Sequence, residues 1–161
     1  MRAVVQRVRE ARVTVDGEVV GEVGRGLLVL LCAMEGDVAA DADWLLRKLV
    51  ALRIFPDEAG RMNLGLDAVV GSRNAGVLVV SQFTLSADLT PKQAKGNRPA
   101  FVKAMGPAAA SMMVDAFVAA LSSALGPQGL HVATGRFGAD MQVGLVNDGP
   151  VTLWFDSRGD D

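Results

Sequence analysis

The sequence is poor in the residues that most hydrolases and metal sites use, with one histidine and one cysteine among 161 residues. A serine–histidine–aspartate triad would have to use His131, which lies in a strand pattern between Leu130 and Val132. A zinc site built from histidine and cysteine needs more ligands than these two residues supply. Cys32 lies inside an apolar run, so we expect a buried apolar group and not a nucleophile.

Nucleotide-binding loops are absent as well. The chain has no Gly-x-x-x-x-Gly-Lys segment and no Gly-x-Gly-x-x-Gly segment that opens a helix. Its acidic residues cluster at turns, at helix starts and in the tail, and no catalytic carboxylate pair is evident. If the protein is an enzyme, we expect it to work without a metal or a cofactor. Catalysis would then depend on hydroxyl and amide donors, on backbone groups and on functional groups of the substrate itself.

Long hydrophobic runs are missing too, since none approaches the roughly 18 residues of a membrane helix, and the start is too charged for a signal peptide. The net charge of -2 gives no overall attraction to nucleic acid, so any such binding must come from a local patch. With 50% hydrophobic residues, the chain can bury a real core. We expect one cytoplasmic domain spanning residues 1–161, with no membrane or DNA partner.

Hydrophobic patterning predicts the secondary structure. Strands are predicted at residues 3–8, 11–15, 18–23, 27–33, 76–80, 130–134, 141–146 and 151–155. Asp16-Gly17 is a two-residue turn that favours positive φ and joins two of these strands. Asp37 can cap a helix that runs to about Arg53, and Pro107 opens a second helix that ends near residue 126. These elements predict a single α/β domain with a mixed, strongly curved, barrel-like sheet and two main helices.

The most informative stretch is Ser81-Gln82-Phe83-Thr84-Leu85, which follows the buried strand at residues 76–80. Polar groups at the end of a buried strand are held rigidly, as a reaction centre requires. The alternative is that Ser81 and Thr84 satisfy local backbone groups at the strand end, which is the commoner arrangement. From this stretch alone, both interpretations stay open.

A basic segment follows between residues 90 and 103. It holds Lys92, Lys95, Arg98 and Lys103 with no acidic residue between them. Lysine and arginine supply most phosphate contacts, so this patch beside the candidate site suits phosphate binding. A solvated run of basic residues is the alternative.

A second stretch, Asn147-Asp148-Gly149-Pro150-Val151-Thr152, completes a pattern. Together with the stretch at residues 81–85, it resembles the D-aminoacyl-tRNA deacylases. The two signatures occur in the family's order and at the family's distance, and the similarity runs from Gln6-Arg7-Val8 to Trp154-Phe155. Supporting segments are residues 11–15, 53–55, 60–63, 96–99, 134–137 and 140–143.

The resemblance implies a homodimer whose active sites lie at the subunit interface. It implies hydrolysis of the ester that joins a D-amino acid, or mischarged glycine, to the 3′ adenosine of tRNA. The mechanism would use the ribose 2′-hydroxyl, with backbone amides around Gln82 and Phe83 holding the oxyanion. The residues implied as catalytic are Ser81, Gln82, Phe83 and Thr84. Those implied as substrate-binding are Arg7, Asn97, Arg98, Pro99, Phe101, Met141, Gly149 and Pro150, and the expected tRNA phosphate contacts are Lys92, Lys95, Arg98 and Lys103.

Chiral selection is expected at Gly149-Pro150. D- and L-residues carry the same groups, so a fixed backbone wall near Cα discriminates better than side-chain contacts do. Gly149 has no side chain to obstruct close approach, and Pro150 stiffens the chain. The sequence alone favours an ordinary turn between two strands. The resemblance instead implies a cis bond inserted into the partner's site, which rejects L-amino acids and admits glycine.

Two other functions stay open. One is a noncatalytic tRNA-binding module that uses the basic patch, although such binders tend to be more basic than this chain. The other is a small esterase with Ser81 or Thr84 as its nucleophile, which the lone histidine disfavours. Release of amino acid from D-aminoacyl-tRNA, L-aminoacyl-tRNA and a generic ester would separate the three functions.

Overall fold

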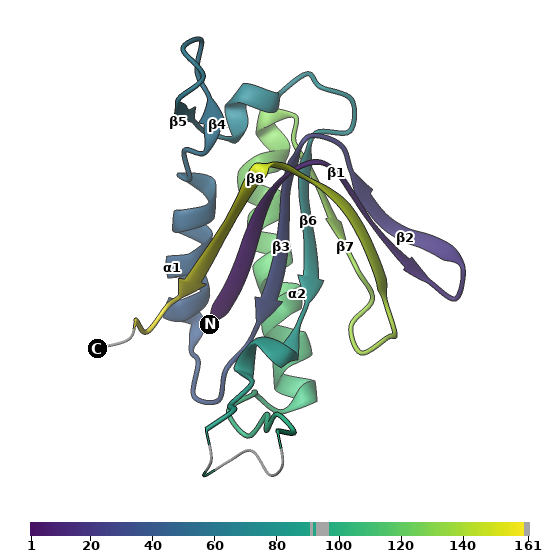
Figure 1. The fold of residues 1–161 in the computed structure, drawn as a ribbon, viewed down its shortest axis with the longest axis vertical. Helices are drawn as coiled ribbons and strands as arrows, with labels where there is room; N and C mark the ends of the chain where they lie inside the picture. The colour runs from purple at the N-terminus through teal and green to yellow at the C-terminus, as the bar shows by residue number, and fades with distance from the viewer. Residues whose placement is uncertain (91, 93–96, 160–161) are drawn as a thin grey trace.

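The computed structural model describes residues 1–90, 92 and 97–159 of the chain (Figure 1). Its main sheet has the order β2-β1-β3-β6-β7, and β8 pairs with β1. Strands β3, β6 and β7 are mutually parallel, whereas β1 is antiparallel to β2, β3 and β8. The strands are β1 (Arg2–Val15), β2 (Glu18–Val23), β3 (Gly26–Cys32), β4 (Phe55–Pro56), β5 (Met62–Leu64), β6 (Gly76–Ser81), β7 (His131–Thr134) and β8 (Gln142–Asp156). The helices are α1 (Ala39–Val50) and α2 (Pro107–Leu125), with short 3-10 turns η1 (Leu66–Val69), η2 (Phe83–Ser86) and η3 (Gly126–Gln128).

The sheet curves until its two sides nearly meet, as expected from the sequence. The first half of β1 pairs with β3 and the second half pairs with β2, so β2 is carried back towards β7. Gly21 on β2 lies against this side, since a Cβ there would be 2.2 Å from the carbonyl oxygen of Thr134. Only glycine allows the strands to approach so closely. The mixed, barrel-like sheet with two helices is therefore confirmed.

Strand β6 is apolar from Gly76 to Val80, where both of its faces are buried. Val77 and Val79 belong to the core that packs under α1 and α2, whereas Leu78 and Val80 belong to a second core inside the curved sheet. Figure 1 shows the two helices side by side on one face of the sheet. A strand buried on both faces loses the alternation of polar and apolar residues, and it can hold a polar residue at its end in a fixed place.

The first helix starts differently from the prediction. The N-terminal residue of α1 is Ala39, and the Asp41 carboxylate accepts a hydrogen bond of 2.9 Å from the Val38 N–H. Asp37 is not the cap. It is buried, accepts a hydrogen bond from the Met34 N–H at 2.6 Å and forms ion pairs with the N-terminal ammonium and Arg158. An aspartate one residue before the cap thus serves to join the ends of the chain.

Helix α2 corrects a second expectation. Residues Pro107–Gln128 are long and apolar enough to cross a membrane by length and composition alone, although the sequence suggested that no such run exists. Val114, Phe117 and Leu121 of this helix are buried in the core beneath it. Alanines occupy much of its outer face and raise the hydropathy with small side chains. The helix thus packs on the core along one buried stripe and leaves its other face exposed.

Two strand boundaries were also wrong. Residues 3–8 and 11–15 form one strand, β1, and residues 141–146 and 151–155 form one strand, β8. The register of β8 on β1 shifts between Gln6 and Glu10, opposite the expected turn at Gly149-Pro150. Here the Asn147 side chain accepts a hydrogen bond from the Val151 N–H at 3.0 Å. A side chain thus replaces a ladder bond, and the strand continues through residues that usually end one.

Candidate active site

A cleft of about 620 Å³ opens where β3 and β6 end. Its wall includes Ser81, Gln82, Phe83, Phe101 and Met141, so the structure brings five of the expected site residues together. The remainder of the lining is mainly apolar and comes from the end of β3, the start of α2, residues 137–139 and Val143. The cleft therefore combines a polar strand end with apolar walls, as a small-molecule pocket does.

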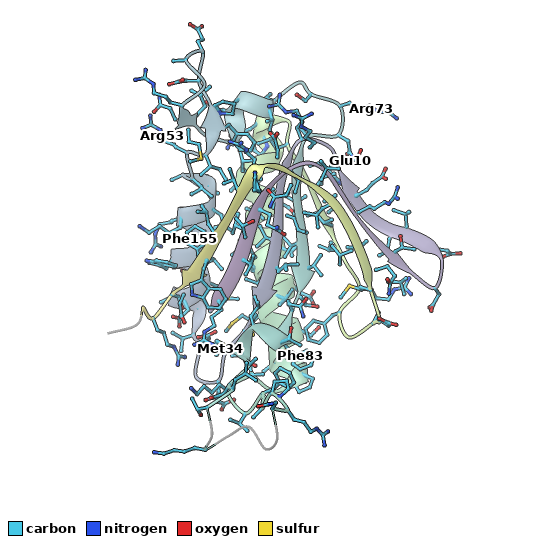
Figure 2. All side chains as sticks on the ribbon, in the orientation of Figure 1. Glu10, Met34, Arg53, Arg73, Phe83 and Phe155 are labelled. Carbon is cyan, nitrogen blue, oxygen red and sulfur yellow. The ribbon has the colours of Figure 1, made fainter. Side chains whose placement is uncertain are left out.

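Several contacts fix the backbone of η2 beside this cleft. The buried Ser86 hydroxyl donates to the carbonyl of Phe83 at 2.7 Å, and the Arg2 guanidinium donates to the carbonyl of Leu85 at 3.1 Å. Arg2 is held by Asp156 at 2.8 Å. Figure 2 shows Phe83 at the lower end of the molecule, and its ring packs edge-on against Phe101 with 5.1 Å between centroids. The segment after Ser81 is thus rigid.

The amide groups at this turn differ in availability. The Gln82 N–H donates to the carbonyl of Leu31 at 2.7 Å, so it is engaged in the sheet and is not free to hold an oxyanion. Phe83 and Thr84 open η2, and the first N–H groups of a helix have no acceptor within it. The Gln82 side chain donates to the Thr84 hydroxyl. Of the two expected oxyanion donors, the Phe83 amide is therefore the available one.

Titratable side chains are scarce in the cleft. Within the described lining, Cys32 is the one such group, and burial raises the pKa of its thiol to about 11. The single histidine, His131, pairs with Gly76 at the far end of β6, roughly 17 Å from Ser81 at the spacing of strand residues. In the described part of the chain, the Ser81 hydroxyl makes no hydrogen bond. Ser81 thus has no histidine beside it, which agrees with the exclusion of a catalytic triad.

The predicted basic segment lies next to the cleft, and its Phe101 lines the wall, whereas Lys92, Arg98 and Lys103 do not. Asn97, Arg98 and Pro99 are exposed, and Asn97 has a positive φ of 63°. Lys92 is exposed as well, whereas Lys95 lies outside the described residues. Lys103 pairs with Asp88 at 3.2 Å. Hydrogen bonds from Thr90 are the main cause that lowers the pKa of Asp88 to about 2, so this carboxylate stays charged beside Lys103.

Arg7, Gly149 and Pro150 meet elsewhere, at a corner where β8 crosses β1. The Arg7 guanidinium donates to the carbonyls of Asp148, at 2.9 Å, and Ile54. A Cβ on Gly149 would lie 2.8 Å from Val151 Cγ2 and 3.0 Å from Arg7 Nη2, and φ at Gly149 is +140°. Only glycine fits this position without strain. The Gly149-Pro150 peptide bond is cis, in agreement with the expectation from the resemblance.

The cleft and this corner are far apart in one chain. Ser81 is level with Phe155, because Ser81 pairs with Leu31, Leu31 with Ala3, and Ala3 with Phe155. Pro150 lies five residues back along β8 and three strands away, which amounts to roughly 20 Å at ordinary strand spacings. Gly149 and Pro150 therefore do not contact the cleft of their own chain.

Strand β8 carries a long free edge. It spans 15 residues and pairs only with β1 in the described part of the chain. Leu145, Val146 and Trp154 on this strand are exposed, with Trp154 at 52%. Long, apolar edge strands in natural proteins are usually covered by another chain or blunted by charge. The side of the molecule that bears Gly149-Pro150 is thus suited to contact a second chain.

Sequence reasoning missed much of the cleft wall. Phe137, Val143 and Val114 line it, yet each is an apolar residue that could equally belong to the core. Phe137 and Val143 lie in segments that support the family resemblance, which is the one signal that could have identified them. Val114 is found only once the fold places three separate segments around the end of β6.

Comparisons with known proteins give one consistent result. The sequence model of a family described as D-Tyr-tRNA(Tyr) deacylase matches residues 4–156. A relative from Ruegeria pomeroyi named D-aminoacyl-tRNA deacylase is 54% identical over 156 residues, which cover 97% of this chain and 99% of the relative. A relative of the same name from a Polaromonas species is 53% identical over 154 residues, 95% of each chain.

Solved structures are similar over the same length. The structure described as c-Myc DNA Unwinding Element Binding Protein has a TM-score of 0.82 and 38% identity, and the match covers 97% of this chain and 98% of that chain. Another, described as a probable eukaryotic D-amino acid tRNA deacylase, has a TM-score of 0.76 at 18% identity, with 96% and 97% covered. At that identity, the second likeness concerns the fold alone.

Proposed function

Because this chain belongs to the D-Tyr-tRNA(Tyr) deacylase family and hydrolyses D-aminoacyl-tRNA, we propose that it does so in a site shared by two copies of the chain. The cleft of one copy holds the aminoacyl ester, and Gly149-Pro150 of the other copy closes it. The distance of roughly 20 Å between these parts within one chain is the observation that carries the proposal. The free edge of β8 supports it, because this edge offers a surface for the second copy.

The chemistry is ester hydrolysis with little help from acids or bases of the protein. A water molecule attacks the carbonyl carbon and the carbonyl oxygen becomes negative. The bond to the ribose 3′-oxygen then breaks, and this oxygen takes up the proton that the water loses, which gives free amino acid and tRNA. The Phe83 amide donates to the developing oxyanion, and Ser81 orients the carbonyl. The ribose 2′-hydroxyl of the substrate assists the leaving group.

An aminoacyl ester suits such a site because it is already activated. Within the described lining, the thiol of Cys32 is the one titratable group, and its raised pKa keeps it neutral. Positioning and one well-placed donor can then supply most of the acceleration. Thr84 is not part of the cleft wall, and its hydroxyl already accepts a hydrogen bond from Gln82. Thr84 therefore supports the turn and does not attack the ester.

Selection of D-residues follows from the wall that Gly149-Pro150 would form beside the substrate Cα. A backbone wall leaves room for hydrogen where an L-residue places its side chain. L-Aminoacyl-tRNA is then rejected, and glycine is admitted because it has no side chain to clash. Arg7 holds this wall through the carbonyl of Asp148, and it acts as a positioning residue. The enzyme would act in the cytoplasm, on the pool of charged tRNA.

The direct test is release of amino acid from D-aminoacyl-tRNA, glycyl-tRNA, L-aminoacyl-tRNA and a generic p-nitrophenyl ester. We expect release from the first two and neither of the others. Equal release from D- and L-substrates would contradict the proposal that Gly149-Pro150 rejects L-residues. Cleavage of the generic ester at a similar rate would instead indicate a small esterase, and tRNA binding without release would indicate a noncatalytic module.

A further inference from the structure

A second groove, of about 750 Å³, lies at the end of the molecule away from the cleft. It runs between the second half of β1, the end of β2, the loop of residues 72–74 and the first part of β8. Figure 2 shows Glu10 and Arg73 at this upper end, whereas Phe83 lies at the lower end. We call it the arginine groove and define it by the four arginines in its lining, Arg9, Arg12, Arg25 and Arg73.

The charge of the arginine groove is opposite to that of the whole chain. Its acidic residues are Glu10 and Glu22, so four arginines against two glutamates leave a local positive excess on a chain of net charge -2. All four arginines are exposed. Among the described residues, the arginines other than Arg9 form no ion pair. Such a patch attracts an anionic partner even when the net charge does not.

Close backbone packing holds the groove in shape. The Gly24 N–H donates to the carbonyl of Asn74 at 2.6 Å, and a Cβ on Gly24 would lie 2.2 Å from the carbonyl oxygen of Arg73. On the other wall, Arg12 lies over Gly144, where an added Cβ would be 3.7 Å from Arg12 Nε. The guanidinium groups thus project from a fixed backbone, which reduces the entropy lost when they bind a ligand.

The groove leads to the corner that bears Gly149. Arg9 Nε donates to Asp148 Oδ1 at 3.1 Å, and Asp148 immediately precedes Gly149. A smaller cavity of about 300 Å³ is lined by Arg9, Arg25 and Asp148. The arginines therefore reach the point on the surface that, in the shared site, closes the cleft of the other copy.

We propose that the arginine groove binds the phosphate backbone of the acceptor arm of the tRNA whose 3′ end lies in the partner's cleft. This inference rests on the proposed function, because it needs Gly149-Pro150 of one copy to lie at the cleft of the other. Arginine suits the task, since its planar guanidinium pairs with phosphate in a bidentate way and keeps its charge. The copy that supplies the chiral wall then also supplies the tRNA contact.

The test compares two double variants that lose equal charge. Arg12→Gln/Arg73→Gln removes two of the four arginines of the groove, and Arg47→Gln/Lys48→Gln changes two exposed basic residues of α1 as the control. Binding of uncharged tRNA is measured over a range of salt concentrations. Each lost phosphate contact changes the slope of log affinity against log salt by about 0.9 on a duplex. The slope measured for the groove variant should therefore be less negative than the wild-type slope by about 1.8. The control should keep the wild-type slope.

A second double variant, with the opposite change of charge, tests the same proposal if Arg12→Gln/Arg73→Gln folds poorly. Glu10→Gln/Glu22→Gln makes the groove more positive, so it should tighten tRNA binding. In hydrolysis assays, the groove variant should have a lower ratio of the rate on D-aminoacyl-tRNA to the rate on D-aminoacyl-adenosine. The short substrate has no phosphate backbone, so it makes no contact with the groove that the variant could lose. An unchanged salt slope, or a slope changed equally by the control, would overturn the proposal.

A DNA duplex of the acceptor-stem sequence separates two sources of the same phosphate chemistry. We expect the groove variant to lose affinity for tRNA; loss for the DNA duplex with unchanged tRNA binding would overturn the assignment. The binding assay uses uncharged tRNA, so it is independent of turnover. Failure of the wild-type protein to hydrolyse D-aminoacyl-tRNA would overturn the proposed function, whereas an unchanged slope overturns the role of the groove.

Discussion

The cleft at the end of β6 and the corner at Gly149 differ in the groups that form them and in what these groups can do to a substrate. The cleft is a largely apolar pocket that holds the Ser81 hydroxyl and the Phe83 amide at a strand end. The corner is an exposed stretch of backbone within β8, the outer strand of the sheet, and it is held by the guanidinium of Arg7. One region can bind and polarise an ester, and the other can present a rigid wall, but neither does both.

This difference explains why both signatures are needed for one activity. A pocket built from side chains binds D- and L-residues alike, whereas a wall of backbone tells them apart at Cα. Since the two regions are roughly 20 Å apart in one chain, the proposed site brings them together from two chains. Changes in the cleft should therefore alter the rate, and changes at the corner should alter selectivity.

The largest effect is expected from Ser81→Ala. Loss of one group that orients or stabilises the oxyanion typically costs about 2.7–4 kcal/mol in the transition state, so kcat should fall on the order of a hundredfold or more. Selectivity for D over L should stay unchanged, because the wall is intact. Ser123→Ala on the exposed side of α2 is the matched control. Near-normal turnover by Ser81→Ala would show that the free hydroxyl of the cleft takes no part.

A smaller effect, on selectivity, is expected from Gly149→Ala. The added Cβ meets Val151 and Arg7 at 3.0 Å or less, and φ of +140° disfavours any L-residue, so the wall must shift. The preference for D over L should fall about tenfold, equivalent to ~1.4 kcal/mol. The rates on D- and L-aminoacyl-tRNA give this ratio directly. Gly126→Ala, where a Cβ has nothing within 4 Å, should retain the wild-type ratio.

A third prediction concerns the basic segment beside the cleft. The pKa of Asp88 is lowered to about 2, so its pairing with Lys103 is present above the ordinary carboxylate pKa and is lost as the pH falls through about 2. At neutral pH, Lys103→Gln should therefore weaken tRNA binding less than Lys92→Gln does. Asp88→Asn should free Lys103 and steepen the salt slope by up to ~0.9. Equal effects of both lysine variants would indicate that Asp88 does not compete with phosphate.

The smallest effect on hydrolysis is expected from Cys32, because this residue lines the cleft and takes no part in the reaction. Burial raises the pKa of its thiol from 9.0 to about 11, so at pH 8 the folded protein should be alkylated about a hundredfold more slowly than the unfolded chain. Because the folded state keeps this proton longer, the free energy of unfolding should fall as the pH rises from about 9 towards 11. Rapid alkylation at pH 8 by iodoacetamide would contradict the buried, neutral thiol.

The hairpin at Asp16-Gly17 and the buried strand that ends at Ser81 could be predicted because their signals are local. The continuity of β8 through Pro150 could not, since it depends on Asn147 supplying a side-chain hydrogen bond in place of the ladder. The arginine groove could not be predicted from the sequence either. Arg12 follows Glu10 by two positions along β1, and Arg73 comes beside it only in the fold.

The two regions of the site were found through the family signatures, whereas their separation came from strand register. No local pattern shows that Ser81 and Phe155 are level in the sheet, because each pairing joins residues far apart in sequence. The same limit applies to Lys103, whose neutralising partner Asp88 lies 15 positions earlier in the sequence. Sequence identified the chemical groups, and tertiary structure showed which of them can act together.

A mixed dimer shows whether one copy supplies the wall for the other. Ser81→Ala and Gly149→Ala chains are co-expressed with different affinity tags, and the dimer that carries both tags is purified. Its active cleft belongs to the Gly149→Ala chain, and our account places the intact wall of the Ser81→Ala chain over that cleft. The mixed dimer should then hydrolyse D-aminoacyl-tRNA with wild-type selectivity at about half the wild-type rate. Hydrolysis of L-aminoacyl-tRNA at the raised level of the Gly149→Ala homodimer would show that the wall acts within its own chain, and would contradict the account.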